Sequence, residues 1–270
     1  MKNFEKWQGC GNDFVIIDSR IDGEIDSPEK ISRICDRHFG IGADGVIYVL
    51  NSDVAEVRMR IFNADGSEAE MCGNGIRCFT KFLLDGKDKT NLSVETGAGI
   101  LKMNLRGNLV TVDMGEPILD AAKIPVAGYG NNRVINESIE VDGKNFKMTC
   151  VSMGNPHCVI FVDDLSEINL SEIGPKVECH KIFPKHVNAE FVQVIGENKL
   201  RMRVWERGSG ITLACGTGAC ATAVAANLNG LTKNYSSVIL DGGTLQIDWR
   251  DDNHIFMTGA AEKVFEGNFI

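Results

Sequence analysis

A short pattern that occurs twice at a fixed spacing is the strongest constraint that this sequence places on its fold. Cys72-Gly73-Asn74-Gly75 recurs as Cys215-Gly216-Thr217-Gly218, 143 residues further along the 270-residue chain. Two shorter matches have the same spacing: Gly11-Asn12 with Gly154-Asn155, and Arg58-Met59-Arg60 with Arg201-Met202-Arg203. Three matches in one register indicate a duplicated chain, so two lobes of similar structure are predicted.

Each half predicts the same order of elements around this pattern. Strands are expected over Val57–Phe62 and over Met202–Trp205, because both segments are rich in apolar residues that suit strands. A turn containing glycine follows each strand, then the CGxG element, and then a helix over Ile76–Leu84 or Ala219–Leu228. The second helix consists mainly of Ala, Thr and Val, with no charge before Lys233, so it is predicted to be buried.

The rest of the chain reads mainly as strands. Hairpins are expected over Leu101–Met114 and Val134–Val151, further strands over Leu240–Thr258, and a helix over Leu170–Cys179. The predicted class is therefore α+β: two pseudo-symmetric lobes, each a curved antiparallel sheet around a buried central helix. Residues 1–117 are assigned to the first lobe, which carries Cys72, and residues 118–260 to the second, which carries Cys215. The tail, about 261–270, is expected to pack on the first lobe.

Composition excludes several classes of function. The formal net charge of −9 disfavours a nucleic acid partner, since a polyanion would be repelled. No segment approaches the length of a membrane span, and the start MKNFEKWQGC has no apolar core of the kind a signal peptide needs. We therefore expect a cytoplasmic protein with no membrane association.

The nine cysteines are predicted to be reduced thiols, which suits a cytoplasmic location. Apart from those of the repeated pattern, most are expected to pack as small apolar groups, including Cys10, Cys35, Cys150, Cys158 and Cys179. The sequence contains no CxxC pair, so no metal site is predicted.

The CGxG pattern at a helix start combines two chemical properties. The first turn of a helix leaves N–H groups without intrahelical partners, and its dipole adds partial positive charge, so a carboxylate binds there readily. A cysteine at the same place has its thiolate stabilised, with pKa values that fall to roughly 3.5–7.5 in known cases. A single pattern of this kind is more often a turn than a site. Two in matching places of a duplicated chain favour a site.

Inversion at a carbon atom is the reaction that best suits two pseudo-equivalent cysteines. A thiolate would remove the α-proton of an amino acid from one face, while a thiol would deliver a proton to the other. The sequence has no clear signature of a pyridoxal phosphate site, so stabilisation of the carbanion is expected to come from the N–H groups of both helix starts. Asparagines at strand ends and in loops would supply further polar contacts to the head group.

At these residues the sequence resembles the diaminopimelate epimerase family. The matching segments span nearly the whole chain in the family's order: GCGNDFVIID at 9–18, RHFGIGADGV at 37–46, FNADGSEAEMCGNGIRC at 62–78, GNPHCV at 154–159 and ERGSGITLACGTGACATA at 206–223. The resemblance implies an isomerase that interconverts LL- and meso-diaminopimelate for lysine and peptidoglycan synthesis. It also implies no cofactor, no metal and a homodimer.

The resemblance assigns roles to individual residues. Cys72 and Cys215 match the two acid/base cysteines, and His157 and Glu206 match residues that support them and the substrate amine. The positions that match substrate contacts are Asn12, Asn63, Asn155, Asn188 and Arg207, together with the carboxylate cradles Gly73-Asn74 and Gly216-Thr217. On the residues alone, His157 could equally be a packed histidine. The sequence departs from some members at Gly45, where they carry Gln; its partner in the repeat is Asn188.

Three other readings compete with this one. Proline racemases and hydroxyproline epimerases also use two cysteines, but their first cysteine is typically followed by Gly-His-Gly rather than Gly-Asn-Gly. Phenazine-biosynthesis isomerases lack the cysteine pair. A thiol redox sensor or metal-binding protein would suit the nine cysteines, but it would not need two anion cradles.

Overall fold

The structure is a computed structural model that describes residues 3–21 and 26–269. The chain divides into two compact units, and each forms its own core. Unit 1 comprises Met1–Asp113 with Thr258–Ile270, and unit 2 comprises Met114–Met257. Within the described ranges, no helix has the length and apolar character that crossing a membrane requires.

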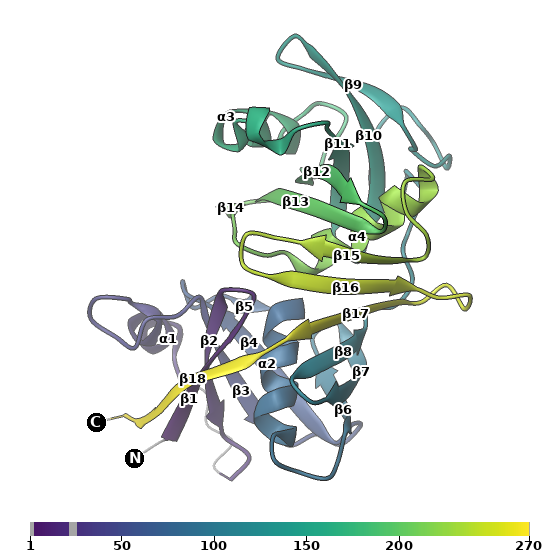
Figure 1. The fold of residues 1–270 in the computed structure, drawn as a ribbon. Coiled ribbons are helices and arrows are strands. Elements are labelled where there is room, and N and C mark those ends of the chain that lie inside the picture. The colour runs from purple at the N-terminus through teal and green to yellow at the C-terminus, as the bar shows by residue number, and fades with distance from the viewer. Residues whose placement is uncertain (1–2, 22–25, 270) are drawn as a thin grey trace. The chain divides into compact units, whose positions relative to one another are not determined.

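Unit 1 is a sheet with a long helix against it (Figure 1). Its elements are β1 (Asn3–Gly9), β2 (Asn12–Asp18), α1 (Pro28–Cys35), β3 (Gly45–Leu50), β4 (Val57–Asn63), β5 (Glu68–Ala69), α2 (Gly73–Leu84), β6 (Asn91–Thr96), β7 (Gly99–Arg106), β8 (Leu109–Asp113) and β18 (Glu262–Asn268). Neighbouring strands follow the order β18, β1, β2, β3, β4, β6, β7 and β8, with β5 beside one end of β4. The C-terminal strand β18 thus lies along the N-terminal strand β1, yellow beside purple in Figure 1.

Unit 2 has the same plan. Its elements are β9 (Glu137–Val141), β10 (Lys144–Ser152), β11 (Pro156–Phe161), the 3-10 helix η1 (Leu165–Glu167), α3 (Leu170–Glu178), β12 (Asn188–Gly196), β13 (Lys199–Glu206), β14 (Gly210–Ile211), α4 (Gly216–Leu228), β15 (Tyr235–Ile239), β16 (Thr244–Trp249) and β17 (Ile255–Ala260), which contains the division between the units. The strand order is β9, β10, β11, β12, β13, β15 and β16, with β14 beside β13. Helix α4 packs on strands β10 to β13 and on β15 and β16.

The strand pairing repeats at the spacing found in the sequence. Phe14 pairs with Gly45 between β2 and β3, and 143 residues later His157 pairs with Asn188 between β11 and β12. Helices α2 and α4 begin at equivalent positions, Gly73 and Gly216. Helix α4 has 13 residues and α2 has 12, so the difference in length lies at their C-terminal ends. Within the sheet of unit 1, β18 takes the place beside β1 that β9 takes beside β10 in unit 2.

The predicted α+β class is confirmed, but the expectation of purely antiparallel sheets is wrong. Strand β2 runs parallel to β3, and β4 runs parallel to β6. The corresponding pairs in unit 2, β11 with β12 and β13 with β15, are also parallel. Parallel neighbours need a long crossover connection, usually a helix. Helices α1 and α3 lie in the crossovers of the first pairs, and α2 and α4 in those of the second.

Both central helices are buried, as predicted for α4. In α2 every residue except Phe82 is buried, and this includes the cations Arg77 and Lys81. The Arg77 guanidinium donates to the carbonyl of Gly73 at 2.9 Å and to the carbonyl of Ala260 at 3.3 Å. A buried cation of this kind needs such acceptors, because its desolvation would otherwise be costly. These bonds tie the start of α2 to the C-terminal part of unit 1.

Helix α1 was not among the predicted elements. Its start carries a recognisable signal, since Ser27 caps Lys30 N–H and Pro28 occupies the first turn, followed by Glu29. The helix has only eight residues, so its apolar period is short. The predicted hairpins and the helix over 170–179 are present as β7–β8, β9–β10 and α3.

Candidate active site

Cys72 occupies the N-cap of α2. Its backbone is extended, with φ −137° and ψ 122°, and its sulfur accepts the Gly75 N–H at 3.5 Å. The thiol is 3.5 Å from Asn12 Oδ1, and the Asn74 side chain donates to the same oxygen at 3.3 Å. The structure therefore brings three predicted site residues of unit 1, Cys72, Asn12 and Asn74, to the start of one helix.

An ion-pair network holds Asn12 in place. Asn12 donates to Asp44 Oδ2 at 2.7 Å, and Arg37 bridges Asp44 and Asp13 at 2.9 and 2.8 Å. Burial alone would raise the pKa of Asp13, but the hydrogen bonds and charges of Arg37 and Lys6 outweigh burial and hold this pKa at about 2. Asp13 thus stays ionised and connects the start of β2 to the loop that carries Asp44.

Asn63 lies in a turn of its own at the end of β4. Its backbone N–H donates to the Ser67 carbonyl at 2.8 Å, and its side chain donates to Ser67 Oγ at 3.0 Å. It also pairs with Gly45 between β3 and β4. A Cβ added at Gly45 would lie 2.5 Å from the Phe62 carbonyl oxygen, so the glutamine of some family members would require a shift of this backbone.

Cys215 occupies the N-cap of α4 in the same geometry as Cys72. Its φ and ψ are −124° and 113°, and its sulfur accepts the Gly218 N–H at 3.3 Å. The Thr217 hydroxyl lies 3.5 Å from the sulfur. The predicted residues Cys215, Gly216 and Thr217 therefore form the first turn of a buried helix.

The expectation of a lowered thiol pKa is wrong for Cys215. Burial raises the pKa of this thiol well above its ordinary value, and the carboxylates of Glu206 and Glu190 raise it further. The Thr217 hydroxyl and the Gly218 N–H act in the opposite direction but are outweighed. A helix start stabilises a thiolate only when desolvation is not the larger effect. In this structure Cys215 is a neutral thiol.

His157 lies in a chain of hydrogen-bonded polar side chains that runs from Asn155 to Glu190. Its Nε2 is 3.0 Å from Asn155 Oδ1, and its Nδ1 is 2.7 Å from Glu190 Oε1. His157 and Glu190 are both fully buried. His157 is therefore a hydrogen-bonded histidine connected to a predicted substrate contact, rather than one packed among apolar groups.

Asn188, Arg207 and Glu206 lie at the neighbouring strand ends. The Asn188 side chain donates to the Pro156 carbonyl at 2.7 Å and accepts the Arg207 backbone N–H at 2.9 Å. The Arg207 guanidinium donates to the Lys185 carbonyl at 3.1 Å, and Glu206 Oε1 accepts the Thr212 hydroxyl. These bonds hold the turn after β13 against the start of β12.

Glu190 was missed by the sequence analysis. It stands in the apolar strand segment Asn188–Val192, where an acidic residue is costly to bury without a partner. An isolated carboxylate in such a segment was the available signal. The sequence alone could not pair it with His157, because the two residues are 33 positions apart.

Metal-ligating side chains gather at one place among the described residues, and neither cysteine of the repeat belongs to the group. Glu178 and His186 have ligand atoms within 4.8 Å of Cys179 and of each other. Both Glu178 oxygens already accept hydrogen bonds, from Trp205 Nε1 at 2.6 Å and from Gly208 N–H at 2.9 Å. An ion pair between Glu178 and His186, at 3.6 Å, accounts for the arrangement. Cys179 is exposed, so the expectation that it packs among apolar groups is wrong.

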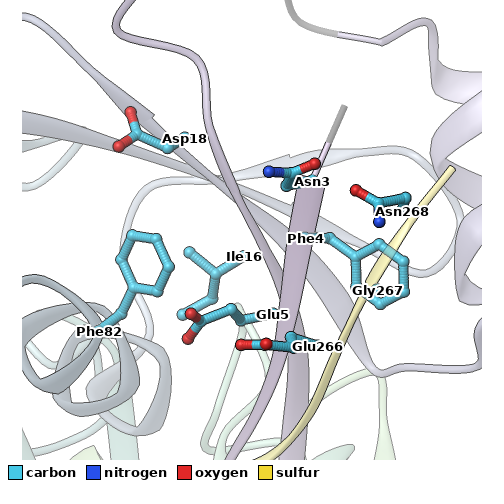
Figure 2. Close-up of a pocket in the computed structure, with 9 residues that line it drawn as sticks. All are labelled: Asn3, Phe4, Glu5, Ile16, Asp18, Phe82, Glu266, Gly267 and Asn268. Atoms are coloured by element: carbon cyan, nitrogen blue, oxygen red, sulfur yellow. The ribbon is translucent and has the colours of Figure 1, made fainter. Parts of the chain in front are cut away.

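Unit 1 contains a cavity of about 440 Å³. Figure 2 shows its lining from β1, β2 and β18, with Phe82 from α2. Of its three carboxylates, Glu5 and Glu266 are paired with Lys263, at 3.0 Å for Glu5 and closer for Glu266, and Asp18 is paired with Arg20. None of the residues predicted for catalysis or substrate binding lines this cavity.

Comparisons with known proteins agree on one family. The model of the family described as diaminopimelate epimerase matches residues 4–119 and 149–264. The chain is 52% identical to the diaminopimelate epimerase of Synechococcus elongatus over 271 residues, covering 98% of this chain and 97% of that protein. It is 50% identical to that of Leptospira biflexa over 273 residues, covering 98% of each.

Solved structures show the same fold at low sequence identity. A phenazine biosynthesis protein of the PhzF family from Bacillus anthracis aligns with a TM-score of 0.70 and 20% identity, covering 100% of this chain and 99% of that one. A hydroxyproline epimerase from Agrobacterium vitis aligns with a TM-score of 0.66 and 13% identity, covering 98% and 90%. At these identities the likeness concerns the fold alone.

Proposed function

The chain belongs to the diaminopimelate epimerase family, and we propose that it interconverts LL- and meso-diaminopimelate with two cysteines and no cofactor or metal. The observation that carries this proposal is the matched placement of Cys72 and Cys215, each at the N-cap of a buried helix with its sulfur on the N–H three residues ahead. Such a duplicated arrangement suits a reaction whose forward and reverse directions are near mirror images. The product would serve lysine and peptidoglycan synthesis.

The two thiols have complementary roles in this proposal. One thiolate removes the α-proton of the substrate, and the other thiol returns a proton to the opposite face of the carbon. The raised pKa of Cys215 supports its assignment as the protonated partner before substrate binds. In the direction in which Cys215 delivers the proton, Cys72 acts as the base, and the two exchange roles in the reverse direction.

The two helix starts are proposed to stabilise the carbanion. Backbone N–H groups of Gly73 and Asn74 and of Gly216 and Thr217 would bind the carboxylate at the reacting end of the substrate, where negative charge develops. Loss of one such donor in other enzymes costs about 2.7–4 kcal/mol of barrier stabilisation. The third N–H of each helix start is taken by the cysteine sulfur, which keeps the sulfur close to the cradle.

The remaining predicted residues bind and orient the substrate in this proposal. His157 and Glu206 support the cysteines and the substrate amine. The contacts to the rest of the substrate come from Asn12, Asn63, Asn155, Asn188 and Arg207. The ion-pair network around Asp44 supports the role of Asn12, because it fixes the amide that meets the Cys72 thiol.

Organisation and location complete the proposal. We propose that the two units are the two lobes of the enzyme and that each contributes one catalytic cysteine. The family resemblance implies a homodimer. All nine cysteines are free, and a two-thiol mechanism needs a reducing compartment, so we place the protein in the cytoplasm.

Proton NMR of LL-diaminopimelate in deuterated water tests the proposal. With reduced enzyme, the α-proton signal should fade as the meso isomer appears, because the returning thiol carries deuterium from the solvent. Exchange of proline or hydroxyproline instead would favour the racemase reading. Absence of exchange with all three amino acids would refute the epimerase and favour a thiol sensor.

A further inference from the structure

Glu190 is a buried carboxylate that the proposed mechanism does not use. It lies on β12, and its side chain is on the sheet face that meets α4, because its carboxyl group comes close to Gly218 of that helix. Its Oε1 is 2.7 Å from His157 Nδ1, while its Oε2 has no hydrogen-bond partner among the described residues. An unpaired buried carboxylate would be strongly destabilising. The negative charge of Glu190 must therefore be neutralised, either by a positive charge on His157 or by a proton on the carboxyl group itself.

Glu190 also reaches the first turn of α4. A Cβ built on Gly218 would lie 2.8 Å from Glu190 Oε1 and 3.2 Å from the Cys215 sulfur. The Gly218 N–H in turn donates to that sulfur. The carboxyl group therefore lies beside the atoms that determine whether Cys215 can carry a negative charge.

The hydrogen bonds of His157 determine the proton count of the pair. With the Asn155 amide oriented as in the structure, its Oδ1 can only accept, so His157 Nε2 must carry a hydrogen. The contact between Nδ1 and Oε1 then requires a second proton, on either atom. An imidazolium with a carboxylate and an imidazole with a carboxylic acid both satisfy this requirement. In both states the pair has no net charge.

Other charged or titratable groups around Glu190 come from the neighbouring elements. They are His157 and Cys158 on β11, Glu206 at the end of β13, and Cys215 at the start of α4. Among the described groups that interact with Glu190, only His157 can supply a positive charge. A second full negative charge beside Glu206 would oppose the thiolate that Cys215 must form in each catalytic cycle.

We propose that Glu190 is a positioning residue, which shares one proton with His157 and so keeps the Glu190–His157 pair beside Cys215 electrically neutral. The pair also fixes the amide of Asn155 through His157 Nε2. This inference rests on the proposed function for its catalytic consequence, but the charge of the pair can be measured without turnover.

Alkylation of Cys215 as a function of pH provides the test. Substrate-free protein is treated with iodoacetamide, and modification at Cys215 is followed by peptide mass spectrometry. A Glu190 carboxylate taken alone would raise the pKa of the Cys215 thiol, as Glu206 does. Because the proton shared with His157 cancels that charge, Glu190→Gln should leave the midpoint of the Cys215 profile where it is in the unaltered protein. A midpoint that falls in Glu190→Gln would mean that a negative charge had been removed, and it would overturn the proposal.

Glu206→Gln is the matched control for this assay. Glu206 raises the pKa of Cys215 by its charge, so its neutral replacement should lower the midpoint. This shift shows that the assay detects a nearby carboxylate. Glu190→Gln and Glu206→Gln make the same chemical change at two carboxyl groups that interact with the same sulfur, so a difference between them reports charge rather than loss of a carboxylate as such.

The turnover rate distinguishes a positioning role from a purely structural one. Glu190→Ala removes the partner of His157, so kcat should fall by about tenfold to a hundredfold with little change in KM, the range found when the partner of a metal-bound histidine is removed. Glu190→Gln should recover most of that loss, because its amide can donate to Nδ1. Equal losses in folded Ala and Gln variants, judged by circular dichroism, would refute the positioning role. If the unaltered protein exchanges no diaminopimelate proton, the proposed function fails, while the alkylation result still decides the charge of the pair.

Discussion

Gly75 and Gly218 hold equivalent places in the two halves but face different neighbours, which allows a matched perturbation. A Cβ at Gly218 would lie 2.8 Å from Glu190 Oε1, whereas a Cβ at Gly75 would lie 3.1 Å from Ile61 Cδ1 and 3.2 Å from Ile47 Cδ1. The methyl ends of Ile61 and Ile47 can move by a few tenths of an ångström. The Glu190 carboxyl cannot do so without lengthening its bond to His157. Gly218→Ala should therefore disturb the protein more than Gly75→Ala.

The magnitude follows from two opposing effects. Alanine is favoured over glycine inside a helix by about 0.8–1.0 kcal/mol, and this gain applies to both variants. Loss of a hydrogen bond to a charged group costs about 1.5–3 kcal/mol, and it applies only at Gly218. Gly218→Ala should then lower the free energy of unfolding by about 0.5–2 kcal/mol. Gly75→Ala should change it little, or raise it by up to about 1 kcal/mol.

Urea unfolding followed by tryptophan fluorescence measures this difference. Trp7 reports on unit 1, while Trp205 and Trp249 report on unit 2. Equal stability of the two variants, or a more stable Gly218→Ala, would show that the Glu190 carboxyl is not held by His157 as described. Gly218→Ala should also lower kcat, because displacement of Glu190 changes the surroundings of Cys215.

Three further predictions follow from the structure. Cys72→Ala and Cys215→Ala should each abolish epimerisation of LL-diaminopimelate in the NMR assay while the circular dichroism spectrum is retained; full activity in either would refute the two-base mechanism. In the substrate-free protein, the midpoint of the Cys215 alkylation profile should lie above the ordinary thiol pKa of 9.0, because burial favours the thiol; rapid alkylation at neutral pH would contradict this. Asp13 has a folded-state pKa of about 2 against 3.8 when unperturbed, so its ionised form stabilises the fold above about pH 4, and this contribution is lost as pH falls toward 2. Asp13→Asn should therefore cost about 1–2 kcal/mol at pH 7, after allowance for solvent screening, and a much smaller amount near pH 2 in urea unfolding.

Much of the fold could be predicted because its signals are local. The CGxG patterns mark the starts of α2 and α4, and the apolar composition of α4 indicates its burial. The hairpin turns at 106–108 and 142–143 are marked by glycine and polar residues. The pairing of β18 with β1 and the parallel pairings are not local, because they depend on which strand edges meet after the crossover helices have packed.

The sequence by itself determined the duplication, the two helix-start cysteines and the resemblance to one family, since each depends on residue types at fixed spacings. Only the tertiary structure decided the state of Cys215 and the partner of Glu190. A helix start lowers the pKa of a thiol and burial raises it, and the balance depends on how much solvent the surrounding strands exclude. Likewise, a carboxylate on β12 and a histidine on β11 form a pair only because parallel pairing brings their strands side by side.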